Sequence, residues 1–325
     1  MNIDERIAEK YDAEALKAAF EENDPTDLPD GYIRMTAGHG GESYLITKYE
    51  KTLLIDTGMA YCGDKLVENI RHALGGRTLD VVVLTHTHYD HIGALPFIIE
   101  EFPEAEICGS AYGQYVFTRD GAKRMIRAMS ENAEKLYGDP EKGNASKQGF
   151  RITRALADGE AVGLGADKDG NSGLVRAIEC KGHTDCSMAY MIEPDMVLFS
   201  SESTGIIQEW DSAEVSIMKK YENMSVSLEK CRSLGARRIV IPHYGILPPE
   251  YKDAYWDIYE WCAKDERDFI GALVEKGCRP DEILAAYTER CWDPKREEET
   301  PKAAFDENAK NVIKVYLEYF GMTEK

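Results

Sequence analysis

Thr85-His86-Thr87-His88-Tyr89-Asp90-His91 follows directly after the apolar run Val81-Val82-Val83-Leu84. The stretch holds four imidazole or carboxylate side chains within six residues, and it contains three of the seven histidines of the chain. Neutral imidazole and carboxylate are the ligands that suit zinc and related first-row metals. The pattern therefore predicts a metal site at the carboxyl end of a buried strand over 80–85.

The composition is that of an acidic globular chain. Of 325 residues, 43% are hydrophobic, and 39 Lys and Arg against 59 Asp and Glu give a net charge of −20. This balance argues against nucleic acid or an anionic membrane as a partner. It permits a small-molecule substrate, even an anionic one, because the local charge of a metal outweighs that of a distant surface.

The cysteines and the apolar runs indicate the compartment that we expect. Eight cysteines are scattered without a CxxC pair, which is typical of reduced thiols in a cytoplasmic protein. The first residues are charged and lack the apolar core of a signal peptide. No run reaches the roughly 20 apolar residues that a membrane-spanning helix needs. We therefore expect a cytoplasmic protein with no membrane partner.

The pattern of secondary structure that the sequence predicts changes twice along the chain. We expect an N-terminal helical segment over 1–30, a β-rich domain over 31–248 with a helical insertion at about 112–150, and a helical C-terminal extension over 249–325. Strands are expected at 43–47, 52–56, 80–85, 106–108, 151–153, 174–179, 189–192, 196–200 and 238–241, and helices at 63–74, 93–101 and 222–234. The aromatic C-terminal helices offer an interface for a homodimer.

The insertion has an amphipathic stripe whose role the sequence leaves open. Its apolar positions at helical spacing are Ala122, Met125, Ile126, Met129, Ala133 and Leu136. An ordinary packed helix and a lid over a substrate both explain this stripe. As a lid, its flexible methionines would suit an acyl or aromatic group.

Three further metal ligands are expected far from the first motif. His183, Glu202 and His243 each follow the end of a predicted strand, as the first motif does. A single histidine in such a place is usually an ordinary core or surface group. Because all three residues follow a strand end, as the first motif does, we expect their side chains to lie at one shared site with the first four.

The chain resembles the metallo-β-lactamase superfamily over about residues 31–248. The resemblance rests on motifs that occur in family order: Leu54-Ile55-Asp56-Thr57-Gly58, the His86–His91 motif, Asp158-Gly159-Glu160, Gly182-His183-Thr184, Leu198–Thr204 and Pro242-His243-Tyr244-Gly245. It implies an α/β fold, the αβ/βα four-layer sandwich, here with a helical insertion and a helical C-terminal extension. It also implies two divalent metal ions, with zinc as the default and iron or manganese as alternatives.

The resemblance also implies a ligand set. It assigns His86, His88 and His183 to the first metal, and Asp90, His91 and His243 to the second. Asp56 would hydrogen-bond to the ligand loops and steady them. Glu202 stands where the family usually has a bridging aspartate. Glutamate is one methylene longer and can still bridge, but the change can alter the metal spacing or preference.

The implied chemistry is hydrolysis by a hydroxide shared between two metals. Asp90 would orient the water, and Tyr244 would stabilise the oxyanion. The candidate substrate contacts are His39, Met125 and Met129. The helical cover is similar to the branch that contains quinolone-signal thioesterases, which favours an ester, thioester or lactone substrate. The alternatives are a phosphodiesterase acting on a small phosphodiester and a metal-containing regulatory binding protein without turnover.

Overall fold

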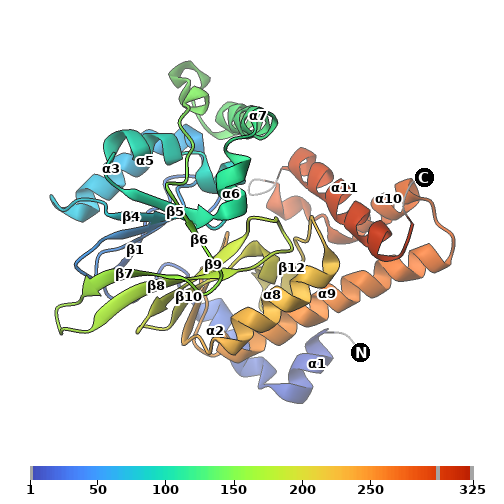
Figure 1. Ribbon diagram of the computed structural model, residues 1–325. Coiled ribbons are helices and arrows are strands. Elements are labelled where there is room, and N and C mark those ends of the chain that lie inside the picture. The colour runs from blue at the N-terminus through green and yellow to red at the C-terminus, as the bar shows by residue number, and fades with distance from the viewer. Residues whose placement is uncertain (1–2, 298–300, 323–325) are drawn as a thin grey trace.

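Two six-stranded sheets face each other at the centre of the molecule, with helices on both outer sides (Figure 1). A computed structural model describes residues 3–297 and 301–322. The ends of the predicted terminal segments, 1–2 and 323–325, and residues 298–300 of the predicted extension lie outside the described residues. The predicted four-layer αβ/βα sandwich is confirmed.

The first sheet has the order β1-β2-β3-β4-β5-β6, and the second has the order β14-β13-β10-β9-β8-β7. The strands of the first sheet are β1 (Tyr32–Arg34), β2 (Tyr44–Ile46), β3 (Leu53–Ile55), β4 (Val81–Val83), β5 (Glu106–Ser110) and β6 (Arg154–Leu156). Those of the second are β7 (Ala161–Ala166), β8 (Ser172–Glu179), β9 (Met188–Glu193), β10 (Val197–Phe199), β13 (Arg238–Ile241) and β14 (Gly245–Ile246). A separate hairpin joins β11 (Ile206–Glu209) to β12 (Ser212–Glu214).

Helices cover the outer face of each sheet. Before the second sheet the chain forms α1 (Ile3–Lys10), α2 (Ala13–Glu22), α3 (Gly63–Leu74), α4 (Tyr89–Ile92), α5 (Leu95–Glu101), α6 (Ala111–Val116) and α7 (Asp120–Tyr137). Within and after that sheet it forms α8 (Tyr221–Ser233), α9 (Tyr251–Glu275), α10 (Pro280–Cys291) and α11 (Lys302–Tyr319). Short 3-10 turns lie at Ala60–Cys62, Pro140–Lys142, Asn144–Ser146, Glu202–Thr204 (η4) and Pro294–Arg296.

Side chains that alternate between the two faces of each sheet form the core between the sheets and the cores under the outer helices. Successive side chains of a strand point to opposite faces, so a continuous apolar run can serve two cores. Val81 and Val83 of β4 pack between the sheets, whereas Val82 packs outward with the apolar side chains of α3 and α5. On β10, Phe199 points between the sheets and Leu198 points outward, toward a core that includes α8 and α9.

The strands β8, β10 and β13 run in the same direction, so their carboxyl ends lie along one edge of the second sheet. β8 and β10 both run antiparallel to β9, and β10 runs parallel to β13. The loops that follow β8, β10 and β13 therefore leave the same edge of the second sheet. The loop after β4 leaves the first sheet, and its residue Thr85 accepts a hydrogen bond at its carbonyl oxygen from Met188 of the second sheet (2.8 Å).

The strand predicted at 151–153 is wrong, because the regular ladder with β5 begins at Arg154. Thr153 contacts Ile107 through its backbone N–H (2.8 Å) and its hydroxyl, but Ile152 is buried in the outer core instead. The sequence interpretation also missed β1, β7 and the hairpin β11–β12. β1 and β12 span three residues each, and β7 contains Gly163 and Gly165, which weaken a strand signal.

The predicted insertion contains two helices, α6 and α7, and the whole predicted stripe from Ala122 to Leu136 lies in α7. Ile126 and Ala133 of α7 are buried, but Met125 and Leu136 are each 64% exposed. Only part of the predicted apolar face therefore packs against the domain.

The helical termini pack on the same core as the second sheet. Side chains of α1, α2, α8, α9, α10 and α11 join one apolar cluster with the outward residues of β9, β10 and β13. The chain divisions expected near residues 30 and 248 stay predictions. Among the described residues, no helix combines the length and the apolar character needed to cross a membrane.

Candidate metal centre

All seven predicted ligand side chains lie in one cluster at the edge between the two sheets. His86 and His88 lie on the extended segment after β4, and Asp90 and His91 lie in the single turn of α4. The other three come from loops after strands of the second sheet: His183 after β8, Glu202 at the start of η4 after β10, and His243 after β13.

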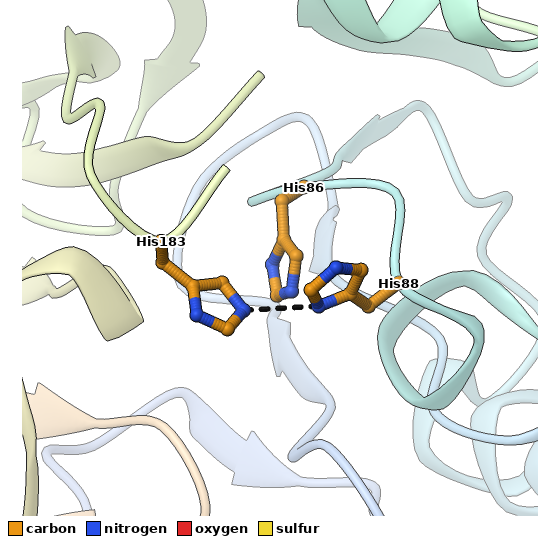
Figure 2. A group of neighbouring side chains, drawn as sticks. All are labelled: His86, His88 and His183. Carbon is orange, nitrogen blue, oxygen red and sulfur yellow. Dashed lines mark hydrogen bonds between the residues drawn. The ribbon is translucent and has the colours of Figure 1, made fainter. Parts of the chain in front are cut away.

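The first group consists of His86, His88 and His183, whose rings converge from three segments (Figure 2). Nε2 of His183 lies 2.9 Å from Nδ1 of His88, and the ring of His86 lies edge-on to both other rings. One ring nitrogen from each residue lies within 4.8 Å of the others. Three imidazoles at this spacing can hold a first metal.

The second group consists of Asp90, His91 and His243. Oδ2 of Asp90 lies 3.6 Å from Nε2 of His91 and 3.4 Å from Nε2 of His243, and the two imidazole nitrogens are 3.2 Å apart. His91 is buried, whereas Asp90 and His243 are partly exposed. A second metal held here would be reached from solvent.

Glu202 lies between the two groups. Its Oε1 is 2.8 Å from Nε2 of His91 and 3.4 Å from Nε2 of His243, while its Oε2 is 3.2 Å from Nε2 of His183. The two carboxylate oxygens therefore contact ligands of both groups. The extra methylene of glutamate does not keep the carboxylate from the bridging position.

Residues outside the ligand set orient it. Asp56 accepts hydrogen bonds from Nδ1 of His91 (2.9 Å), from the backbone N–H of Thr85 (2.8 Å) and from the Thr85 hydroxyl (2.6 Å). Nδ1 of His183 faces the carbonyl oxygen of Ser216 at 2.8 Å. Such contacts fix which ring nitrogen is free for a metal. Asp56 was predicted, but Thr85 and Ser216 were missed, and nothing in the local sequence around Ser216 indicates its role.

The backbone is held in an unusual conformation at two of these positions. Asp56 has φ of 54° and His243 has φ of 60°, the left-handed region that non-glycine residues rarely adopt. Such conformations cost on the order of 1–3 kcal/mol and persist where the surroundings enforce them. Both residues contact the cluster, so the strain lies at the site.

The buried charges perturb one another. Burial lowers the pKa of His86 well below its usual value and lowers that of His88 to about 4. Burial would also lower the pKa of His91, but Asp90, Asp56 and Glu202 outweigh it and raise that pKa well above the usual value. Burial opposes ionisation of Glu202, yet the surrounding histidines, His183 foremost, hold its pKa well below the usual range. Neutral His86 and His88 beside an ionised Glu202 are the forms that bind metal.

Two buried polar atoms support a metal at this position. Neither Nε2 of His86 nor Oε1 of Glu202 makes a hydrogen bond of normal geometry, although Oε1 lies close to His91. Leaving such atoms unsatisfied inside a protein costs free energy, which a shared cation would recover. The five imidazoles and two carboxylates form a donor set that suits zinc, iron or manganese. The residues present therefore fit two divalent metals.

A cavity of about 740 Å³ opens onto the cluster. His88, Asp90, His183, Glu202 and His243 form its floor, and all four other predicted catalytic or substrate-contact residues also line it, namely His39, Met125, Met129 and Tyr244. The hydroxyl of Tyr244 accepts a hydrogen bond from Asn23 (3.2 Å), and its ring stacks on Phe20. The ring of His39 packs against Tyr137 of α7. The catalytic and contact roles of these residues stay predictions.

Part of the lining was missed from the sequence. α11 contributes Ala304, Glu307, Asn308 and Asn311 to the cavity, and the hairpin β11–β12 contributes Gln208 and Glu214. These residues lie more than a hundred positions from the histidine motif and have no local ligand pattern. Only the tertiary placement of the C-terminal helices could reveal them.

Comparison with known proteins agrees with this geometry. The family model described as the metallo-beta-lactamase superfamily matches residues 37–243. A metallo-beta-lactamase family protein from Thermus thermophilus has a similar structure, with a TM-score of 0.58 at 16% identity over 90% of this chain and 95% of that one. The archaeal superfamily protein ST1585 from Sulfolobus tokodaii gives a TM-score of 0.51 at 18% identity over 74% of this chain and 87% of that one.

Similarity in sequence to curated proteins is local. ST1585 of Sulfurisphaera tokodaii is 33% identical over 93 residues, which are 26% of this chain and 34% of that protein. Ribonuclease J of Mycolicibacterium smegmatis is 32% identical over 101 residues, which are 27% of this chain and 18% of that enzyme. The matches thus span about a third or less of these two relatives.

Proposed function

Because the chain belongs to the metallo-beta-lactamase superfamily, we propose that it is a metal-dependent hydrolase of an ester or thioester, with lactones as related substrates. The observation that carries this proposal is the seven-residue cluster, five of whose side chains line a cavity large enough for a small molecule. Members of one superfamily differ in substrate, so the substrate class is argued from the cavity.

We assign two roles to the residues of the cluster, namely binding the metals and orienting the attacking water. His86, His88 and His183 would hold one divalent metal, His91 and His243 with Asp90 a second, and Glu202 would bridge them. Bound there, the metals would supply Lewis acidity that activates water and polarises a carbonyl group. Asp90 is more exposed than Glu202 and lines the cavity, so its carboxylate is placed to orient the attacking water.

The walls of the cavity favour an acyl compound over a phosphodiester. Met59, Met125, Ile126, Met129 and Met218 bring flexible apolar side chains to it. Arg34 and Arg296 also line it, but Arg34 pairs with Glu42 and Arg296 pairs with Glu214 at 3.2 Å. Cations that are already paired give little added attraction for a phosphate group.

Two measurements test the proposal. Elemental analysis of protein purified without added metal should find close to two transition metals per chain. Activity should be compared on matched thioester, lactone and bis-nitrophenyl phosphate substrates. Preference for the phosphodiester would favour the phosphodiesterase alternative, and metal without any turnover would favour a regulatory binding protein.

Substitution of Glu202 tests the proposed bridging role directly. Glu202→Gln removes the negative charge between the metal groups and should lower kcat/KM by about 100-fold or more, with loss of metal. Glu202→Asp keeps the carboxylate and should retain most of the metal. Glu68→Gln on the exposed face of α3 is the matched control. Equal activity and metal content in Glu202→Gln and wild type would contradict the bridging role.

A further inference from the structure

We propose that the cavity selects a neutral, amphipathic substrate, whose acyl chain lies along α7 and whose uncharged hydrogen-bonding group is bound by Asn308 and Asn311 of α11. This inference rests on the proposed function and names the substrate class of the same site. The helices α7 and α11, labelled in Figure 1, both line this cavity and present contrasting side chains to it.

The wall from α7 is apolar and incompletely covered. Met129 lies four residues after Met125 and three after Ile126, and all three side chains line the cavity. Ile126 is buried, but Met125 is 64% exposed. Exposed methionine beside a reactive centre provides apolar surface that a flexible acyl chain can cover. Met59 and Met218, from other segments, extend this surface.

The wall from α11 is polar and fixed in orientation. Ala304, Asn308 and Asn311 follow at spacings of four and three residues and so share one face, which lines the cavity. The opposite face carries Ala309 and Ile313, which are buried in the core with α9 and α10. Because that face is anchored, the two carboxamides are held toward the cavity. The Asn311 carboxamide donates one hydrogen bond to the carbonyl oxygen of Glu307 (3.2 Å), which leaves its second N–H and its oxygen for a ligand. Together the two carboxamides thus offer donors and acceptors, which suit an amide or hydroxyl group.

The charges of the lining argue for a neutral ligand. Among the described residues that line the cavity, the arginines are Arg34 and Arg296, and each is paired with a glutamate. Glu307, next to Asn308, also lines the cavity and pairs with Lys310 (2.8 Å). Phosphates carried on a part of the substrate away from the metals would therefore gain no unpaired side-chain cation from this lining, which disfavours them.

The test uses N-acetylcysteamine thioesters of acetate, butyrate, hexanoate and octanoate with the metal-loaded protein. These are neutral and carry one amide near the thioester. We expect kcat/KM to rise about three- to fourfold for each buried methylene. Octanoyl-coenzyme A, with the same acyl chain on a phosphorylated carrier, should be cleaved at least tenfold less efficiently.

Variants of each wall separate the two contacts. Met125→Ala with Met129→Ala should flatten the chain-length dependence and leave the acetyl ester within twofold of wild type. Asn308→Ala with Asn311→Ala should raise KM about tenfold for the octanoyl N-acetylcysteamine ester, but leave S-ethyl thiooctanoate, which lacks the amide, unchanged. Val226→Ala on α8 is the control, because Val226 is equally exposed (59%) but lies outside the cavity lining. Unchanged melting temperatures show that all variants fold.

A binding measurement keeps the two proposals apart. N-acetyl-N′-octanoylethylenediamine replaces the thioester sulfur by NH and is not readily hydrolysed, so calorimetry reports its binding without turnover. Binding that both double variants weaken supports the inference even if no thioester is cleaved, an outcome that defeats the proposed function alone. A flat chain-length series, preference for the coenzyme A ester, or no binding of the analogue overturns the inference.

Discussion

The carboxylate of Asp56 contacts His91 of the cluster on the side away from the cavity, whose lining does not include Asp56. It accepts three hydrogen bonds, one from His91 and two from Thr85, all within 2.6–2.9 Å. These contacts lock the ring of His91 so that its other nitrogen faces Glu202 and His243. The affinity of this cluster for a metal would therefore depend on a residue that need not touch the metal itself.

Replacing Asp56 by asparagine should lower metal affinity about 10- to 100-fold. Asparagine tolerates the positive φ at this position, so the backbone can be kept. Its amide NH₂ cannot accept the hydrogen bonds that a carboxylate oxygen accepts, so His91 or Thr85 loses a partner. Competition with a chromophoric chelator measures the dissociation constant. Asp158→Asn, which alters a carboxylate paired with Lys230, is the control. A dissociation constant within twofold of wild type would show that Asp56 does not support the centre.

At this scale, the clustering of the seven candidate ligands was predictable from the sequence, and their surroundings were not. His86 to His91 carry a local motif, and His183, Glu202 and His243 share its position after a strand. Ser216, Asn308 and Asn311 carry no such signal, because their role depends on where β12, α10 and α11 pack. A side chain that serves through tertiary placement is not visible in local sequence.

Among the elements, the three C-terminal helices meet at a buried carboxyl group. Glu266 of α9 is 8% exposed and lies among Tyr287 of α10 and Tyr316 of α11. Burial, with the charge of Glu214, raises its pKa to about 8, and the nearby tyrosine hydroxyls and the charge of Arg290 oppose this rise only in part. One of its oxygens, Oε1, has no hydrogen-bond partner. The group is therefore protonated in the folded protein at neutral pH.

This carboxyl should make stability depend on pH. In the unfolded chain Glu266 loses its proton near pH 4.5, whereas in the folded protein it keeps it to about pH 8. Between these values the folded state binds more protons, so its contribution to stability falls as pH rises. Glu266→Gln removes the titration, so the stability of wild type relative to this variant should fall between pH 5 and 8, on the order of a few kcal/mol.

Urea unfolding at several pH values measures this difference. Glu275→Gln, at the exposed end of α9, should keep the wild-type pH dependence. Parallel curves for wild type and Glu266→Gln would contradict the buried neutral carboxyl. Tyr316 also packs α11 into the core. The same variant therefore tests whether the contact between Glu266 and Tyr316 keeps Asn308 and Asn311 of α11 in place at the cavity.

Long periodic elements were predicted well, and short ones were not. α3, α8 and the C-terminal helices follow their apolar periodicity closely, and β4 and β13 follow their β-branched runs. β6 has the sequence Arg-Ala-Leu and forms because β5 offers a free edge, so its position was misjudged by three residues. β7 is interrupted by two glycines, and its pairing with β8 decides its conformation.

Across the whole molecule, the cluster joins the two halves of the sandwich. Four of its side chains follow β4 of the first sheet, and three follow strands of the second. The sheets also share an apolar core, so the fold does not rest on metal alone. A bound metal would nevertheless add stability to the native state, because an unfolded chain cannot hold these ligands together.

Removal of metal should therefore lower the melting temperature without unfolding the protein. A metal at 100 times its dissociation constant stabilises the folded state by about 2.7 kcal/mol. For a chain of 325 residues that corresponds to a shift of roughly 4 °C. Calorimetry before and after chelation, with zinc added back, measures it, and Glu202→Gln should show a smaller shift because it binds less metal. If elemental analysis shows that the metal is gone and the melting temperature is unchanged, the cluster does not link the two sheets energetically, and the centre serves chemistry alone.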